Sequence, residues 1–275
     1  MTTITETMRP AAPARPPAFG DLRLAARQVL YEQRSFWRNR GRAFFSFALP
    51  AMFVVIFATI NRGDHMDRLG GIPADAFVIP GVLAYAVVMA TFANIAIDLA
   101  IARDTGVLKR AQGTPLPAWA FIAARIGSAV IVAIAVSAVT LLIADLAYGV
   151  TVRADAVPGL LIALVAGTAC FGALGVAAVR LITRADSGTA VTTALVLPLT
   201  FISGVWGDFG GLPSWLDSVG KLFPIQHLAH ALQVTFDPNA TGSGISGSDL
   251  LVLGIWLAAG LVLGAHALRA ELRRA

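Results

Sequence analysis

The side chains able to do covalent or acid–base chemistry are few in this sequence and are not spaced like a catalytic site. The two lysines, Lys109 and Lys221, are followed by Arg110 and Leu222, so neither completes the GxxxxGK[ST] loop that cradles nucleotide phosphates. The HExxH motif of zinc proteases and the GxSxG motif of serine hydrolases are also missing from the sequence. We therefore predict that the chain is not an enzyme on its own and that any ATP is hydrolysed elsewhere.

Metal-binding and redox residues are equally sparse. His227 and His230 lie three positions apart on a short predicted helix and could bind a metal, but solvated surface histidines are the favoured interpretation. The single cysteine, Cys170, has no partner in the chain and is predicted to fill packing space. We predict no metal site and no cofactor bound by this chain.

The elements that carry these residues are long and apolar. Hydrophobic residues make up 57% of the 275 residues and charged residues only 13%, about half of the roughly 25% found in soluble domains. Six stretches reach the length of about 20 apolar residues that a bilayer requires. They run over Ala43–Ile60, Ala76–Ile97, Ile126–Leu146, Val157–Val179, Thr189–Trp206 and Leu250–Leu268. The fold class predicted is an all-α integral membrane protein with six transmembrane helices, and the net charge of +5 does not indicate nucleic-acid binding.

The distribution of basic residues predicts the topology. If the N-terminus faces the cytoplasm, 17 of the 21 Lys and Arg residues fall in cytoplasmic segments and four in the outer loops. Basic residues are retained on the cytoplasmic side of membrane proteins. Both termini are therefore expected in the cytoplasm, as is the loop of residues 104–119.

The polar residues inside the spans do not suggest an ion pathway. Charged residues fall at the predicted ends of the spans, and an acidic residue at the midplane, which a proton-driven transporter would normally keep, is missing. Uncharged polar residues that reach inward include Thr91, Asn94, Ser137, Thr140, Thr168, Thr192, Thr193, Thr200 and Ser203. Hydrogen bonds to backbone or to neighbouring helices are their favoured role. The Gly260 and Gly264 pair predicts close helix packing, within one chain or between two.

Two regions outside the spans have helical patterns. Residues 1–19 are expected to be a disordered tail, and residues 20–41 an amphipathic helix with arginines on one side and apolar residues on the other. This helix is expected to lie in the headgroup layer, although a soluble helix packed on a partner is the alternative. Between spans five and six, residues 214–233 predict two helices too short to cross, and hence a re-entrant outer helical hairpin. Residues 42–275 form the six-span domain.

Three segments resemble the membrane subunit, or permease, of type-2 ABC exporters, the group that contains drug-resistance, polyketide and polysaccharide exporters. The first is the amphipathic helix leading into RAFFSFALPAMFVVIF at residues 42–57. The second is GVLKRAQGTPLPAWAFIAARI at residues 106–126, similar to the family's G-x-L-(K/R)-R-x-x-x-T-P-(L/V) loop. The third is PLTFISGVWGDFGGLPSWLDSVGKLFP at residues 198–224, which departs from many members at Gly207-Asp208.

The resemblance implies that the first cytoplasmic loop forms a coupling helix that docks on a separate cytoplasmic ATP-binding-cassette ATPase. The residues implied in coupling are Leu108, Lys109, Arg110, Thr114, Pro115 and Leu116. Lys109 and Arg110 could instead be topology anchors alone. ATP and Mg are expected on the partner ATPase, and a second permease subunit, in a homodimer or a homologous heterodimer, is expected to complete the pathway.

The expected function is export of a small amphipathic compound such as a drug, an antibiotic or a lipid-like molecule. The residues expected on the transport path or outer gate are Asn94, Thr200, Phe201, Ser203, Trp206, Trp215 and Phe223. Interfacial anchoring is the alternative for Trp206 and Trp215. Other functions left open are export of a lipid-linked polysaccharide or lipid, secondary transport or a channel, and a membrane-embedded enzyme. The implied location is a plasma membrane, expected to be a bacterial inner membrane, with membrane lipids around the spans.

Overall fold

The computed structural model describes residues 19–60, 65–66, 72–112, 118–206, 214–240 and 242–274. Its helices are α1 (Phe19–Arg38), α2 (Arg40–Ile60), α3 (Ala74–Val88), α4 (Asn94–Asp104), α5 (Val107–Gln112), α6 (Ala118–Tyr148), α7 (Val157–Ala178), α8 (Gly188–Ile202), α9 (Ser214–Gly220), α10 (Pro224–Phe236) and α11 (Gly247–Arg274). A π-helical turn at Met89–Ala93 joins α3 to α4, and short 3₁₀ turns lie at Ala154–Ala156, Val179–Leu181 and Ala185–Ser187. The strands β1 (His65–Met66) and β2 (Ile72–Pro73) make one small antiparallel pair.

Six helices are long and apolar enough to span a membrane, which confirms the predicted fold class. They cover Arg40–Ile60, Phe77–Asp104, Ala120–Tyr148, Ala154–Leu181, Ala185–Ile202 and Gly247–Ala267. The largest difference is at span two, which continues as α4 to Asp104 instead of ending at Ile97. Span five ends as a helix at Ile202, before the predicted Trp206. Each shift has a local cause that is described with the site below.

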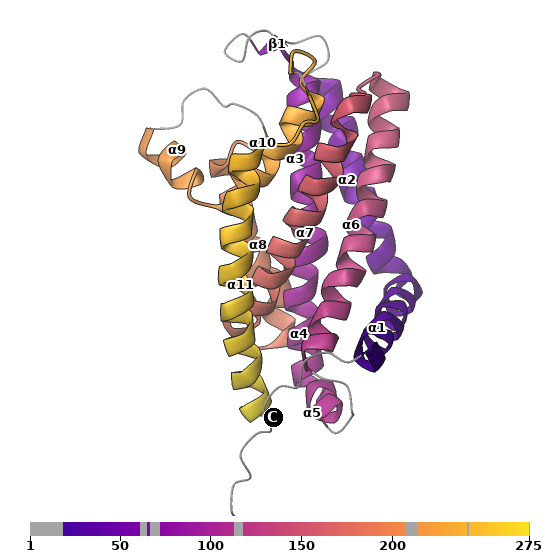
Figure 1. The fold of residues 1–275 in the computed structure, drawn as a ribbon, viewed down its shortest axis with the longest axis vertical. Helices are drawn as coiled ribbons and strands as arrows, with labels where there is room; N and C mark the ends of the chain where they lie inside the picture. The colour runs from indigo at the N-terminus through magenta and orange to yellow at the C-terminus, as the bar shows by residue number, and fades with distance from the viewer. Residues whose placement is uncertain are drawn as a thin grey trace, which may run out of the picture.

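Spans two and four form the centre of the bundle (Figure 1). In the apolar 18-residue core of each span, 78% of span two and 61% of span four are buried, against 22% for each of spans one, five and six. The continuous apolar sequences of α3 and α7 fit this position, because a helix that is hydrophobic all round has no polar face to expose. Cys170 is fully buried in α7, as predicted.

The glycine pair in span six packs α11 against α7 of the same chain. A Cβ atom on Gly260 would lie 3.0 Å from the Leu174 backbone nitrogen, and one on Gly264 would lie 3.2 Å from a Val176 methyl group. The two helices run together along the bundle (Figure 1) and form its most extensive helix–helix contact. The choice between intrachain and interchain packing is thereby settled for this pair.

The amphipathic sequence before span one forms α1, which lies beside the lower part of α6 in Figure 1. Its Gln33 side chain donates hydrogen bonds to the carbonyl and hydroxyl oxygens of Ser128 at 2.9 and 3.0 Å. Phe36 is buried, whereas Leu30 and Trp37 are 62% and 52% exposed. The exposed apolar side chains are consistent with the predicted position in the headgroup layer.

The two short helices predicted between spans five and six are α9 and α10. α10 packs on α3, α7 and α11, and its Ile225, Leu228 and Leu232 are almost fully buried. α9 lies at the outside of the bundle, at the left of Figure 1. This half of the molecule contains the larger hydrophobic cluster, and a second cluster lies at the α5 end.

Candidate functional site

The short helix α5 begins directly after span two. Thr105 donates its hydroxyl proton to the Ile101 carbonyl at 2.7 Å, and Gly106 then turns the chain with φ +71°, a left-handed value that favours glycine. Leu108 is only 3% exposed because it packs into the second hydrophobic cluster, which also contains Leu99. Arg110 is exposed and donates to the Thr105 carbonyl at 3.3 Å. The buried leucine thus attaches α5 to the spans while Arg110 faces outward.

Two polar contacts tie the turn before α5 to the loop between spans four and five. The Asp104 carboxylate accepts a hydrogen bond from the backbone N–H of Ala185 at 2.7 Å. The Arg103 guanidinium donates to the Thr183 carbonyl at 3.1 Å. These contacts explain why span two continues as a helix to Asp104, since its terminal charged residues have partners. A displacement of α5 would therefore move α4 and the start of α8 together.

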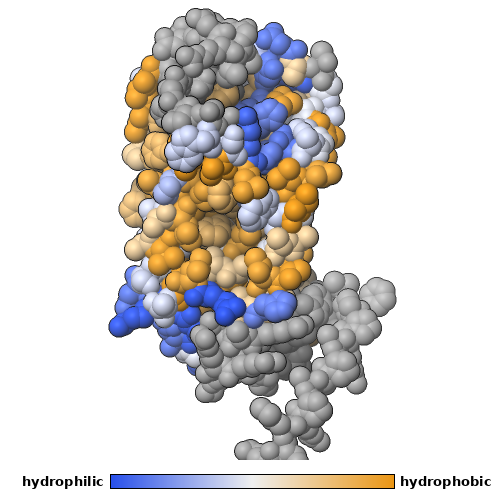
Figure 2. All heavy atoms as spheres, turned by 90° about the vertical axis from the view of Figure 1, so that its left-hand side faces the viewer, coloured by the Kyte–Doolittle hydropathy of each residue, from blue (hydrophilic) through white to orange (hydrophobic). Residues whose placement is uncertain are grey.

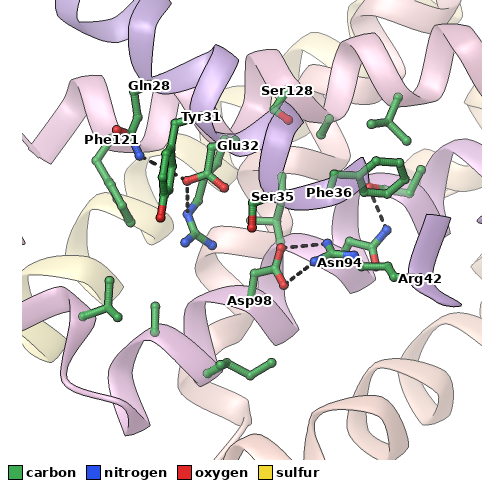
Figure 3. Close-up of a pocket in the computed structure, with 18 of the residues that line it drawn as sticks. Gln28, Tyr31, Glu32, Ser35, Phe36, Arg42, Asn94, Asp98, Phe121 and Ser128 are labelled. Carbon is green, nitrogen blue, oxygen red and sulfur yellow. Dashed lines mark hydrogen bonds and ion pairs between the residues drawn. The ribbon is translucent and has the colours of Figure 1, made fainter. Parts of the chain in front are cut away.

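Two ion pairs lie beneath α1 around a cavity of about 270 Å³ (Figure 3). Arg42, at the start of α2, binds Asp98 of α4 through two hydrogen bonds of 2.8 and 2.7 Å. Glu32 of α1 lies 3.6 Å from the Arg125 Nε atom of α6. Each pair joins elements far apart in sequence, so the cavity is the meeting point of α1, α2, α4 and α6. Asn94 also lines it.

A groove of about 260 Å³ begins at Arg42 and follows the face shared by α2, span two and α8. Its lining is mixed, with apolar side chains from α2 and hydroxyl groups from α8, and it includes Arg42, Phe45, Leu49, Tyr85, Met89, Asn94, Thr189, Thr192 and Thr193. Thr192 donates to its own helix at the Gly188 carbonyl, 2.9 Å away. A lining of this composition suits a molecule with both apolar and hydrogen-bonding parts.

Aromatic rings gather at the Tyr85 end of this groove. Trp206 lies with its ring centroid 5.3 Å from Phe53, 5.2 Å from Phe57, 5.0 Å from Tyr85 and 6.4 Å from Phe201. The segment that carries Trp206 packs closely against α3 because Gly81 has no side chain. A Cβ atom there would lie 1.8 Å from the Val205 carbonyl oxygen. This contact also explains why the chain leaves the helix at Ile202, since residues 203–206 turn across α3.

A polar cluster fixes α10 to the start of α11. Asp249 is 5% exposed and its carboxylate lies 2.7 Å from His227 Nδ1 and 2.6 Å from His230 Nδ1. His227 Nε2 also lies 2.9 Å from the Lys221 carbonyl, so both of its ring nitrogens face acceptors. The hydrogen bond with Asp249 raises the pKa of His230. The expectation of solvated histidines is therefore wrong for His227, whose side chain is 19% exposed, and holds only for His230 at 60%.

Nothing in the described part of the chain suggests catalysis. No group of three or more His, Cys, Asp or Glu side chains within the ranges given above is arranged to hold a metal ion. The arrangement offers instead a lined groove, a set of interhelical ion pairs and an attached terminal helix. Such features can bind a molecule and transmit a movement, but they supply no nucleophile or general acid at a reacting atom.

Comparison with known families identifies the type of protein. The family model described as ABC-2 type transporter matches residues 24–236, which is most of the chain. The chain belongs to the ABC-2 type transporter family. It is a multi-pass membrane permease of that family and has no ATPase activity itself. ABC-2 permeases generally pair with ATPase subunits. No curated protein matches this permease.

The predicted coupling residues are only partly described in the permease. Leu108 is buried and Arg110 is exposed. The side chain of Lys109 and the residues Thr114, Pro115 and Leu116 lie outside the described residues. The coupling role of the whole set stays a prediction.

The predicted path residues fall into separate places. Asn94 lines the groove. Phe201 and Trp206 meet in the aromatic cluster, and Thr200 and Ser203 are buried beside them in sequence. Two residues lie elsewhere: Trp215 is 66% exposed on α9, and Phe223 stacks on Trp256 of α11 with centroids 6.2 Å apart. The structure thus brings together only part of the predicted gate, whose function stays a prediction.

Several residues at or beside the groove were missed from the sequence. Phe53, Phe57 and Tyr85 complete the aromatic cluster but lie within uniformly apolar spans, where no signal distinguishes them from lipid-facing residues. The Arg42–Asp98 pair joins residues 56 positions apart. Its only signal was one basic and one acidic residue at predicted ends of neighbouring spans.

Proposed function

We propose that this permease exports a small amphipathic compound through a pathway formed between itself and a second permease subunit, identical or homologous. The observation that carries this proposal is the groove on the α2–α8 face, which runs from Arg42 to the aromatic cluster around Trp206. Its hydroxyl and amide groups can bind polar parts of a substrate, and aromatic rings give apolar parts a broad, non-directional contact. ATP and Mg would be bound by a separate ATPase.

The exposure of the two helices supports a partner on this face. The apolar 18-residue cores of spans one and five are each only 22% buried. Phe45 and Leu49 of α2 and Leu197 of α8 are 60%, 41% and 47% exposed. A groove open along one side cannot keep lipid away from a polar substrate, whereas a second permease laid against it would close the path. We infer that α2 and α8 provide one half of that path.

Coupling to the ATPase would act through α5. Leu108 packs in the same hydrophobic cluster as Leu99 and Ile182, so a push on the exposed side of α5 would move the ends of spans two and four with it. The Asp104–Ala185 hydrogen bond extends the movement to the start of α8, which lines the groove. ATP-driven closure of two ATPases would thereby widen or narrow the path between the two permeases.

The orientation of this machinery follows from the predicted topology, in which α5 and both termini face the cytoplasm. Reporter fusions after Arg40, Arg110 and Arg184 should report the cytoplasm, and a fusion after Arg153 should report the outside. A reporter that gives the opposite location at any of these sites would contradict the topology that places α5 on the side where ATP is available.

The transport path is tested by removing its aromatic end. Trp206→Ala and Phe201→Ala should each lower export in cells that also express the ATPase, because both shorten the apolar wall beside Tyr85. Phe44→Ala is the matched control, since Phe44 is 66% exposed on α2 and does not line the groove. The first measurement is the susceptibility of these cells to a panel of drugs. Any compound to which expression of the transporter lowers susceptibility is then tested for uptake into inverted vesicles. Equal export by all three variants would refute the path.

The coupling site is tested by charge reversal. Lys109→Glu with Arg110→Glu should insert normally but retain less ATPase on purification, since an interfacial pair replaced by like charges costs several kcal/mol. Arg184→Glu is the control, because Arg184 is 80% exposed and lies outside α5. The measurements are ATPase co-purification and stimulation of ATP turnover in reconstituted membranes. Wild-type assembly in the α5 variant would leave the two residues as topology anchors.

A further inference from the structure

A second cleft, of about 630 Å³, lies among α7, α8 and α11, on the side of α8 away from the groove. Apart from its two ends the wall is apolar, and it includes Phe171, Leu174, Leu195, Leu199, Trp256 and Leu263. Figure 2 shows the corresponding side of the molecule as a hydrophobic band with a hollow in it, bordered below by hydrophilic residues. The proposed transport path makes no use of this cleft.

The cleft is closed at the end nearer α10. Phe223 stacks on Trp256 with an interplanar angle of 20°, and the Trp256 Nε1–H group donates to the Leu222 carbonyl at 3.0 Å. From Trp256 to His266, α11 advances roughly 15 Å at 1.5 Å per residue. This length is about half of the roughly 30 Å hydrocarbon core of a bilayer. The cleft therefore has about the depth of one leaflet and ends near the middle of the membrane.

The other end of the cleft carries positive charge. Arg180 lies in the 3₁₀ turn that ends α7 and is exposed, and no hydrogen bond or ion pair joins its side chain to another residue in the described ranges. His266 donates its Nδ1 proton to the Val262 carbonyl at 2.8 Å, which leaves Nε2 as the ring nitrogen without a backbone partner. Among the residues whose side chains the structure describes, none that lines the cleft is acidic. An apolar slot with a cationic end fits a molecule that has an apolar tail and an anionic head.

We propose that this cleft binds an anionic phospholipid of the leaflet at the Arg180 end. An acyl chain lies along α11 between Leu195 and Leu263 and ends at Trp256. The phosphate accepts hydrogen bonds from the Arg180 guanidinium, whose planar fork matches phosphate oxygens, and His266 provides a second polar contact. In the predicted topology this is the cytoplasmic leaflet, which is rich in anionic lipids. The closed outer end identifies the occupant as a resident lipid and not as a transported compound.

The test uses Trp256 as a reporter. A variant that keeps Trp256 and replaces the other four of the five tryptophans with phenylalanine is reconstituted in phosphatidylcholine nanodiscs. Either phosphatidylglycerol or phosphatidylcholine brominated near the end of its acyl chains is added at a low mole fraction. We expect quenching to show a preference of about fivefold for phosphatidylglycerol, the factor equivalent to about 1 kcal/mol per basic residue at an anionic surface.

Two further variants separate binding from general charge effects. Arg180→Gln should remove the preference, while Arg184→Gln should keep it, because Arg184 is outside the cleft and lies 3.8 Å from Asp186. Ala177→Phe, which fills the cleft, should reduce quenching by both lipids. Equal quenching by the two lipids in the parent protein, or a preference that survives Arg180→Gln, would overturn the proposal. Both arginines are exposed, so their replacement leaves the core intact.

Discussion

Removing the Asp98 carboxylate should cost this permease about 2 kcal/mol of unfolding free energy. Asp98→Ala deletes both hydrogen bonds to Arg42, of 2.8 and 2.7 Å, and leaves the guanidinium without its acidic partner. Exposed ion pairs contribute about 0–1 kcal/mol, whereas loss of one partner from a buried pair costs about 3–5 kcal/mol. The two side chains are 30% and 28% exposed, so an intermediate value applies.

The assay is reversible denaturation in mixed detergent micelles, with the free energy read from the transition midpoint. Asp186→Ala is the matched control, because Asp186 is 90% exposed and lies 3.8 Å from Arg184, a geometry that contributes little. A double variant, Asp98→Ala with Arg42→Gln, should recover part of the loss, since no unpaired charge remains. The reasoning fails if Asp98→Ala is no more destabilising than Asp186→Ala.

The other predictions concern the half of the molecule that contains α10. Gly81→Ala should lower the same midpoint strongly, because its Cβ would lie 1.8 Å from the Val205 carbonyl, whereas Gly254→Ala, with nothing within 4 Å, should leave the midpoint unchanged or raise it. Stability should also depend on pH through His230, whose pKa is raised by its hydrogen bond with Asp249. Its contribution is complete below the ordinary value of about 6.5 and falls as pH rises through the raised pKa. Because the His230 side chain is 60% exposed, this contribution amounts to at most about 1 kcal/mol. The melting temperature should therefore fall less steeply between pH 6 and 9 for His230→Gln than for the parent protein.

The sequence was sufficient for the number and approximate limits of the spans, because membrane insertion depends on segment hydrophobicity, which is local. It was less accurate where charged residues continue a helix. Span two extends through Asp98 and Asp104 because each carboxylate has a partner on another element. Such partners are far away in sequence, and no periodic pattern records them. The spans could be counted, but their ends depend on the assembled bundle.

The same reasoning explains what was missed in the site. The sequence indicated aromatic residues at the end of span five and just after it, and Phe201 and Trp206 do meet. It could not indicate that Tyr85 would join them or that Phe223 would pack on α11 instead, since both outcomes depend on which faces of apolar helices meet. Hydrophobic periodicity carries little information when every face of a helix is apolar, as in span two.

The dependence of α10 on span six has a consequence for the order in which the protein is assembled during synthesis. The polar contacts of His227 and His230 with Asp249, and of the Leu222 carbonyl with Trp256, all require α11, which leaves the ribosome after the other spans. Before that moment the side of α7 that carries Leu174 and Val176, on which Gly260 and Gly264 of α11 pack, also lacks its most extensive neighbour. A nascent chain halted after α10 would therefore hold five spans together with α9 and α10, without the polar contacts that anchor α10. Such an intermediate exposes helix surface in the membrane, and insertion of α11 covers that surface.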